Sequence, residues 1–341
     1  MELPRRVVMG KDALLELSEI CADLKLSGRA LIVTGPSTIR VAGKEISDLL
    51  EGYQPEVMIS RASKMEEVDR AENLAKEIQA GFVIGAGGGR SIDIAKLTSL
   101  RLRIPFLSVP TAASHDGICS AVASLTVNGE STSIPAQSPI AIIADTEIIS
   151  TAPARLLSAG CGDIISNYTA ILDWQLAKRL RNEEFSEYAA ALSDMTARMI
   201  VDLAPSIRPG LEESARVVVK ALISSGVAMS IAGSSRPASG SEHKFAHAMN
   251  RIAPGKGLHG ELCGLGTIIM MYLHGGNWEM IRSALRHTGA PTSASELNID
   301  PDDVIEALVR AHEIRPERYT ILDTGLNRTA AIKAAELTKV I

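Results

Sequence analysis

The chain has 341 residues, of which 46% are apolar and only 3% aromatic, and its formal net charge is −5. At this length folding buries roughly three quarters of the unfolded surface, so neither disulfides nor a structural metal are needed. The apolar fraction excludes a disordered chain, and the acidic balance with few aromatic side chains argues against nucleic acid as a partner. We expect one large or two smaller domains.

The sequence shows no signal for export or for crossing a membrane. The first segment, "MELPRRVVMGKDALLEL", has no apolar stretch of signal-peptide length, and no later run approaches 18 consecutive apolar residues. The four cysteines are scattered and form no CxxC pair: Cys21, Cys119, Cys161 and Cys263. Thiols spaced in this way are typical of proteins in a reducing cytosol. We therefore expect a cytoplasmic protein with no membrane span.

The first half alternates short apolar runs with helical patterns. The segment 65–80 has apolar positions at helical spacing, and the runs predicted as buried strands are 29–35, 55–60, 81–89, 104–110 and 140–145. This alternation predicts an α/β domain with a mostly parallel, Rossmann-like sheet. Residues 117–139 are a polar excursion containing Asn128-Gly129, a turn signal that predicts a hairpin before the last strand.

The strand pattern stops near Ser150. Long amphipathic or apolar helical segments follow, interrupted by turns such as "RPASGS" and "APGKG". We therefore predict two domains, an α/β domain over 1–150 that binds a dinucleotide and an all-helical domain over 151–341 that binds metal and substrate.

A glycine-rich turn follows the third predicted strand, in "GAGGGRSIDIAK" over 85–96. It is not GxGxxG, because Arg90 stands where the third glycine is required, and it is not a Walker A loop, because Ile84 replaces the first glycine of that motif. The next strand ends in the small-residue turn "VPTAASHDG". Ligands of open α/β sheets bind beyond the carboxyl ends of the strands, so two such turns favour a phosphate or dinucleotide site over simple helix packing.

Three histidines cluster in the second half. His243 and His247 are four residues apart and share one face of a predicted helix, but Lys244 excludes the HExxH motif of metalloproteases. His259 begins a later apolar helix, and Asp163 opens the first helix of this half. One carboxylate and two imidazoles with an open position are typical of catalytic zinc, although spacing leaves open which histidine is not a ligand.

Five segments together carry a family resemblance: "GGGRSIDIAK", "PTAASHDG", "CGDIISN", "SGSEHKFAH" and "LHGELCG". In this order they resemble the superfamily of iron-containing alcohol dehydrogenases, glycerol dehydrogenases and dehydroquinate synthase-like proteins. Within it, the chain looks like the archaeal sn-glycerol-1-phosphate dehydrogenases. The likeness extends from about residue 4 to the segment 314–322.

The resemblance implies the roles of individual residues. One zinc ion per subunit is expected on Asp163, His243 and His259, and substrate contacts from His247, Asp116 and Asp163, with Asp163 and His247 catalytic. The residues implied to bind NAD or NADP are Gly87, Gly88, Gly89, Arg90, Ser91, Ile92, Asp93, Thr111, Ala112, Ala113, Ser114 and Ser120.

The expected reaction is hydride transfer between NAD(P)H and dihydroxyacetone phosphate, giving sn-glycerol 1-phosphate for archaeal membrane lipids. Zinc would polarise the carbonyl, and a bound water and His247 would deliver the proton, since the ordinary pKa of histidine suits a proton shuttle. The substrate phosphate needs a cation, for which Lys256 and Arg318 are candidates, with solvated surface charges as the plain alternative. The protein is expected to form a homo-oligomer.

Three other functions are considered. Glycerol dehydrogenase shares the fold and metal but uses an unphosphorylated substrate, and a dehydroquinate synthase-like cyclase usually has glutamate where Asp163 stands. A nucleotide-binding regulator has no need of an open metal site. The first predicted strand ends in "VTGPSTIR", where Gly35, Ser37 and Thr38 could meet the adenosine ribose. Arg40 is close by, and no acidic residue occurs before Glu45. We therefore expect both NADH and NADPH to be accepted.

Overall fold

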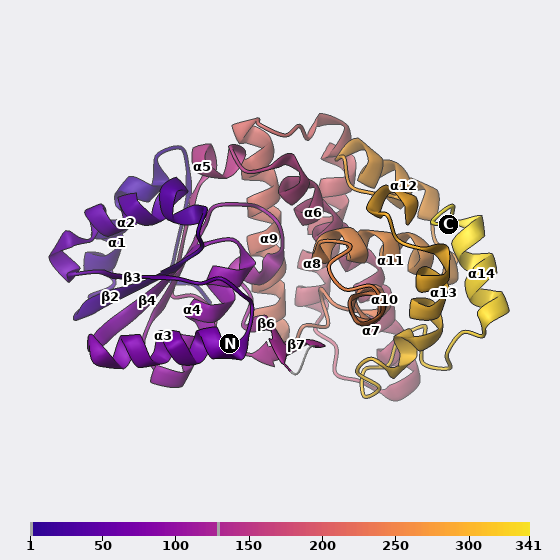
Figure 1. The fold of residues 1–341 in the computed structure, drawn as a ribbon. Coiled ribbons are helices and arrows are strands. Elements are labelled where there is room, and N and C mark those ends of the chain that lie inside the picture. The colour runs from indigo at the N-terminus through magenta and orange to yellow at the C-terminus, as the bar shows by residue number, and fades with distance from the viewer. Residues whose placement is uncertain (1–2, 128–129) are drawn as a thin grey trace. The chain divides into compact units, whose positions relative to one another are not determined.

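Figure 1 shows a computed structural model of the chain, which describes residues 3–127 and 130–341. Internal contacts divide the chain into two units. The first comprises Met1–Ala154 with Pro209–Ser230, and the second comprises Arg155–Arg208 with Ile231–Ile341. The segment Pro209–Ser230 groups with the first unit, whereas the sequence analysis placed everything after residue 150 in the helical half. The domain limits near Ser150 stay a prediction.

The first unit contains a six-stranded parallel sheet with the strand order β1-β8-β5-β4-β2-β3. Five of its strands confirm the apolar runs: β2 (Arg29–Thr34), β3 (Glu56–Ile59), β4 (Ala80–Gly87), β5 (Phe106–Pro110) and β8 (Ala141–Asp145). An edge strand, β1 (Arg6–Gly10), was not predicted; its residues are exposed or half-buried, so it lacks the apolar run of a central strand. The parallel sheet and the helical second half confirm the predicted fold class.

Helices cover both faces of this sheet, as Figure 1 shows. The apolar core packs the sheet against α1 (Leu17–Asp23) and α2 (Lys44–Leu49), while α3 (Met65–Glu77) and α4 (Gly89–Leu102) pack together on the opposite face. Shorter turns complete the unit: η1 (Ala13–Glu16), η2 (Ile39–Gly43), η3 (Glu51–Tyr53), η4 (Asp116–Ile118) and α5 (Thr146–Ser150). The sheet thus presents the carboxyl ends of β4 and β5 side by side.

The predicted hairpin is present as the antiparallel pair β6 (Val122–Val127) and β7 (Glu130–Pro135). The predicted Asn128-Gly129 turn lies outside the described residues. The long helix α9 (Glu212–Ala232) is apolar and long enough to cross a membrane by length and composition, and 56% of its most apolar window is buried inside the structure. A core helix of a folded protein meets the same criterion, so α9 is weak evidence for a span.

The second unit is built from helices, and none of its residues, all of which the structure describes, lies in a strand. Its long helices are α6 (Ala154–Ile165, from Arg155 on), α7 (Asn167–Arg181), α8 (Glu187–Leu203), α10 (Ser241–Ile252), α11 (His259–Leu273), α12 (Trp278–His287), α13 (Pro301–Arg310) and α14 (Arg328–Leu337). Three short turns join them: η5 (Ala204–Ser206), η6 (Ser295–Leu297) and η7 (Ala311–Glu313). All four cysteines of the chain are free and buried.

Candidate metal and substrate site

Three helices of the second unit bring the predicted metal donors together. Asp163 lies in the last turn of α6, His243 in the first turn of α10, and His259 is the first residue of α11. Their donor atoms, with the thiol of Cys263, all lie within 4.8 Å of one another. Asp163 does not open its helix as expected, because α6 already begins directly after Pro153, a residue suited to a helix start.

Glu242 fixes the orientation of the His243 ring. Its Oε1 lies 2.9 Å from Nδ1 of His243 and accepts the Gly240 N–H at 2.6 Å, while Oε2 accepts the Thr169 hydroxyl at 2.7 Å. With Nδ1 donating to the carboxyl group, Nε2 of His243 keeps a free electron pair for a ligand. Burial raises the pKa of Glu242 to about 7 and lowers the pKa of His243 well below its usual value. The ring is therefore neutral, as a metal ligand must be.

The first turn of α11 is held by Glu261. Its Oε2 accepts the Leu258 N–H at 2.7 Å, which caps the helix, and its two oxygens accept Nε and Nη2 of Arg155 at 2.6 and 2.7 Å. Such a two-pronged guanidinium–carboxylate pair fixes orientation as well as distance. Since Arg155 belongs to α6, the pair ties the helix start that carries His259 to the helix that carries Asp163.

Two glycines allow α6 and α11 to cross closely. A Cβ added at Gly260 would lie 1.9 Å from the Ala159 carbonyl oxygen, and one added at Gly162 would lie 2.3 Å from the Gly260 carbonyl oxygen. Any larger residue would push the two backbones apart. The close crossing places Oδ1 of Asp163 3.6 Å from Nε2 of His259.

The spacing of these donors fits a divalent cation. Nε2 of His259 lies 3.1 Å from Nε2 of His243 and 3.6 Å from Oδ1 of Asp163. Two ligands about 2.0–2.1 Å from a tetrahedral zinc ion are separated by roughly 3.3 Å, so the observed distances match. The His259 side chain is 38% exposed, which leaves the donors accessible to a substrate oxygen.

Cys263 joins this group and was missed by the sequence analysis, which treated it as one scattered thiol among four. Its Sγ lies 3.6 Å from Nε2 of His259, one turn earlier on α11. Residues four apart on a helix share a face, so the spacing from His259 was a readable signal. The thiol supplies a fourth donor within reach of the cluster.

His247 lies on the same helix as His243, with its ring centre 6.2 Å from that of His259. Burial, followed by the charges of His259 and His243, lowers the pKa of His247 well below the ordinary value. His247 therefore does not have the ordinary histidine pKa expected from the sequence. A neutral imidazole keeps one N–H donor and one acceptor, which suits a hydrogen bond to a substrate hydroxyl or carbonyl.

In the first unit, the two predicted ligand-binding turns follow the carboxyl ends of the neighbouring central strands β4 and β5. Gly87 pairs with Pro110 in the β4–β5 register, and the Thr111 N–H donates to the Gly87 carbonyl at 3.0 Å. Gly87 has φ +147°, and a Cβ there would lie 3.0 Å from Oγ1 of Thr38, so the turn requires glycine. The turn leads directly into α4, whose first amides face the end of the sheet and can bind an anion.

The remaining residues predicted to bind the cofactor come from the segments that follow β4 and β5. Arg90 donates to the Arg61 carbonyl, and the Asp93 carboxylate is buried, bound by Lys96 at 3.2 Å and by the Ser124 N–H at 3.0 Å. Asp93 thus anchors the hairpin. The other predicted residues lie at the start of α4, just after β5, and after η4, and they are Gly88, Gly89, Ser91, Ile92, Ala112, Ala113, Ser114 and Ser120. Their role as cofactor ligands stays a prediction.

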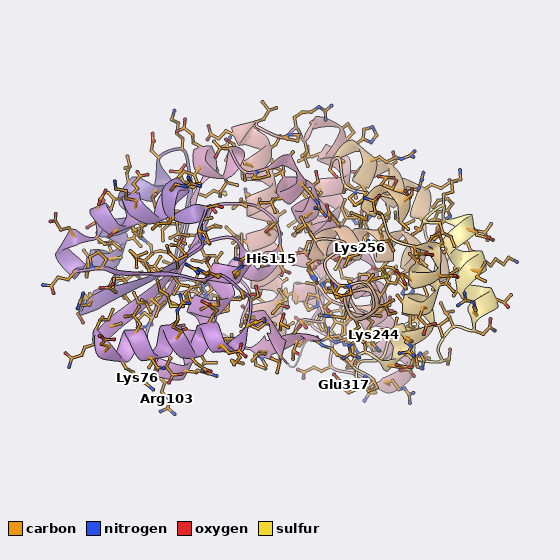
Figure 2. The ribbon with its side chains drawn as sticks, viewed as in Figure 1. Lys76, Arg103, His115, Lys244, Lys256 and Glu317 are labelled. Atoms are coloured by element: carbon orange, nitrogen blue, oxygen red, sulfur yellow. The ribbon has the colours of Figure 1, made fainter. Side chains whose placement is uncertain are left out.

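The other predicted residues fall in different surroundings. Asp116, in the first unit, accepts the Ser225 hydroxyl of α9 at 2.9 Å. Arg318, in the second unit, donates Nη1 to the Ser239 carbonyl at 2.7 Å and Nη2 to the Ser235 hydroxyl at 2.8 Å. Lys256 lines a pocket of about 390 Å³ in the second unit together with Arg155, Glu261 and Glu296. It is labelled in Figure 2.

Solved structures show where this fold occurs. Glycerol dehydrogenase from Schizosaccharomyces pombe aligns with a TM-score of 0.82 at 20% identity, covering 99% of this chain and 89% of that one. A probable glycerol dehydrogenase from Sinorhizobium meliloti aligns with a TM-score of 0.80 at 20% identity, covering 99% and 97%. At this identity the likeness establishes the fold alone.

Sequence comparison is more specific. Residues 8–153 match the family model described as iron-containing alcohol dehydrogenase. The chain is 68% identical to glycerol-1-phosphate dehydrogenase [NAD(P)+] of Methanothrix thermoacetophila, covering all of this chain and 97% of that protein. It is 55% identical to the enzyme of the same name from Methanothermobacter thermautotrophicus, covering 100% and 99%. The chain therefore belongs to the glycerol-1-phosphate dehydrogenase family.

Proposed function

We propose that the protein catalyses the reversible NAD(P)H-dependent reduction of dihydroxyacetone phosphate to sn-glycerol 1-phosphate, the backbone of archaeal membrane lipids. The observation that carries this proposal is the convergence of Asp163, His243 and His259 with His247 beside them. Full-length relatives at 68% and 55% identity, both called glycerol-1-phosphate dehydrogenase, support the same reaction.

The metal-binding residues in this proposal are Asp163, His243 and His259, which hold one zinc ion. A bound divalent cation supplies Lewis acidity toward the carbonyl oxygen of the substrate. Glu242 holds the His243 ring with its Nε2 toward the donors, and Glu261 with Arg155 holds the helix start that carries His259. The chain therefore pre-arranges the three ligands through residues that do not touch the ion.

Substrate contacts are assigned to His247, Asp163 and Asp116. His247 is neutral, so it binds the oxygen at C2 through its N–H and positions the carbonyl for attack. When the alcohol forms, the oxygen gains a proton; the neutral imidazole of His247 would give up its N–H proton while its other nitrogen takes one from solvent.

The cofactor is NAD or NADP, bound by the turn 87–93, the turn 111–114 and Ser120. The nicotinamide ring supplies the hydride, while the protein orients it. The amides at the start of α4 and the glycines before it bind the pyrophosphate. We further propose a cytoplasmic location, a dinucleotide-binding domain over 1–150, a metal- and substrate-binding domain over 151–341, and a homo-oligomeric assembly.

The test compares substrates and their mirror images. Zinc-loaded protein is assayed with NADH and either dihydroxyacetone phosphate or dihydroxyacetone, and in reverse with pure sn-glycerol 1-phosphate or sn-glycerol 3-phosphate. We expect kcat/KM to favour the phosphorylated ketone, and oxidation of sn-glycerol 1-phosphate alone. Preference for dihydroxyacetone would instead identify a glycerol dehydrogenase, and oxidation of sn-glycerol 3-phosphate would refute the stereochemical assignment.

A further inference from the structure

A turn after η7 places an arginine close to the histidine cluster. The turn runs from Arg315 to Arg318 and is closed by the Arg318 N–H, which donates to the Arg315 carbonyl at 2.9 Å. It follows η7, which packs against α10, the helix that carries His243 and His247. Arg315 has φ +46°, in the left-handed region that few residues other than glycine adopt.

Arg318 fixes this turn through hydrogen bonds from its guanidinium to the segment that precedes α10. Its two terminal nitrogens donate to the Ser239 carbonyl and the Ser235 hydroxyl, just before α10 begins. Burial lowers the pKa of Arg318 to about 10. Arg318 therefore ties the turn to the start of α10 and is poorly placed to bind a ligand as well.

Arg315 differs from Arg318 in that its guanidinium makes no hydrogen bond among the described residues, although the charge of Glu317 acts on it. Its side chain is half-buried, and it makes no hydrogen bond or ion pair with any residue in 3–127 or 130–341. Burial lowers the pKa of Arg315, and its positive charge contributes to lowering the pKa of both His243 and His247. Glu317, two positions on, is the one carboxylate whose charge acts on Arg315, and it forms no ion pair with it among the described residues. The guanidinium therefore keeps its hydrogen-bond donors for an anion from solution.

We propose that Arg315 binds the phosphate of the substrate and thereby selects phosphorylated over unphosphorylated substrates. This inference rests on the proposed function. A planar guanidinium binds two phosphate oxygens at once, and two charge-assisted hydrogen bonds of this kind are the strongest recognition a single side chain offers. The anion expected is a phosphate monoester dianion carried by a small keto or hydroxy compound.

Lys256 is the rival cation, and its surroundings disfavour an anion. Its pocket is also lined by the carboxylates of Glu261 and Glu296, and the Arg155 in the same pocket is already paired with Glu261. Lys256 precedes α11, whereas Arg315 follows η7, so the two arise from different segments of the second unit. The two candidate cations can therefore be tested separately.

The variant for the test is Arg315→Gly, because glycine adopts φ +46° without strain and the turn is expected to fold. The matched control is Arg251→Ala, an exposed arginine in the last turn of α10 whose charge also acts on His247. Lys256→Ala tests the rival. For each protein, the ratio of kcat/KM for dihydroxyacetone phosphate over dihydroxyacetone is measured, and binding of inorganic phosphate is measured by calorimetry.

We expect Arg315→Gly to lower the ratio about a hundredfold, mainly through KM for the phosphorylated substrate, and to lose phosphate binding. Arg251→Ala and Lys256→Ala should keep both. Arg315→Lys should recover only part of the ratio, since an ammonium is a point charge. A wild-type ratio in Arg315→Gly, or a loss in Lys256→Ala instead, would overturn the inference while leaving the proposed function intact. A wild-type enzyme without preference for the phosphorylated ketone would remove the proposed function itself.

Discussion

The carboxyl group of Glu242 is expected to control metal affinity without touching the metal. In Glu242→Gln the amide oxygen can take the place of Oε1 and keep the bonds from Gly240 and His243. The amide NH2 then takes the place of Oε2 and donates to the Thr169 hydroxyl, which can still donate to the Ser166 carbonyl at 3.1 Å. The substitution therefore preserves the geometry and removes only the acid group that makes His243 a more basic ligand. Loss of such a partner typically weakens metal binding by about 10- to 100-fold, or roughly 1.4–2.7 kcal/mol.

The assay is a competition titration of zinc between the protein and a coloured chelator, with no turnover involved. Glu279→Gln, the same chemical change at an exposed position of α12, is the control and should bind zinc as the wild type does. Circular dichroism verifies that both variants are folded. A change of less than about threefold in zinc affinity for Glu242→Gln would refute the view that the carboxyl group tunes the ligand.

Three further predictions concern the same machinery. His259→Ala should lose zinc, whereas His247→Ala should keep zinc and turn over about 10²- to 10⁴-fold more slowly; equal metal content and equal rates would contradict these roles. Gly260→Ala puts a Cβ 1.9 Å from the Ala159 carbonyl oxygen, so we expect the free energy of unfolding to fall by about 1–3 kcal/mol and zinc occupancy to fall as well. Thermal unfolding and metal analysis measure the two effects, and an unchanged melting temperature would argue against a tight crossing of α6 and α11. The kcat/KM values with NADH and NADPH should agree within about a hundredfold, near 2.7 kcal/mol, because Arg40 is exposed after β2 and no carboxylate occurs there before Glu45. Stronger discrimination would reveal a repulsive group elsewhere.

The sheet was predictable because its central strands are continuous apolar runs. β1 escaped prediction because an edge strand with exposed residues has no such run, and its pairing with β8 is set by tertiary contact. The grouping of most of α9 with the sheet unit could not be predicted from the sequence either, because the apolar pattern of a helix does not show which element it packs against.

The site was predictable where residue type and spacing carry the chemistry. Asp163, His243 and His259 were named in advance, and the structure places their donor atoms together. Burial and hydrogen-bond partners cannot be read from spacing, so the roles argued for Glu242 and Arg315 emerged only from the packed helices. Charge alone did not show that Arg318 donates to the Ser239 carbonyl and to the Ser235 hydroxyl before α10.

The three donors belong to helices that are distant in the sequence, so an ion held by all of them would act as a removable cross-link of the second unit. An unfolded chain cannot hold the same ion, and mass action then adds about 2.7 kcal/mol to the free energy of unfolding when free zinc is a hundred times the dissociation constant. The melting temperature of the protein should therefore rise with the zinc supply. In a metal-starved cell, the same chain should open more often and meet proteases sooner.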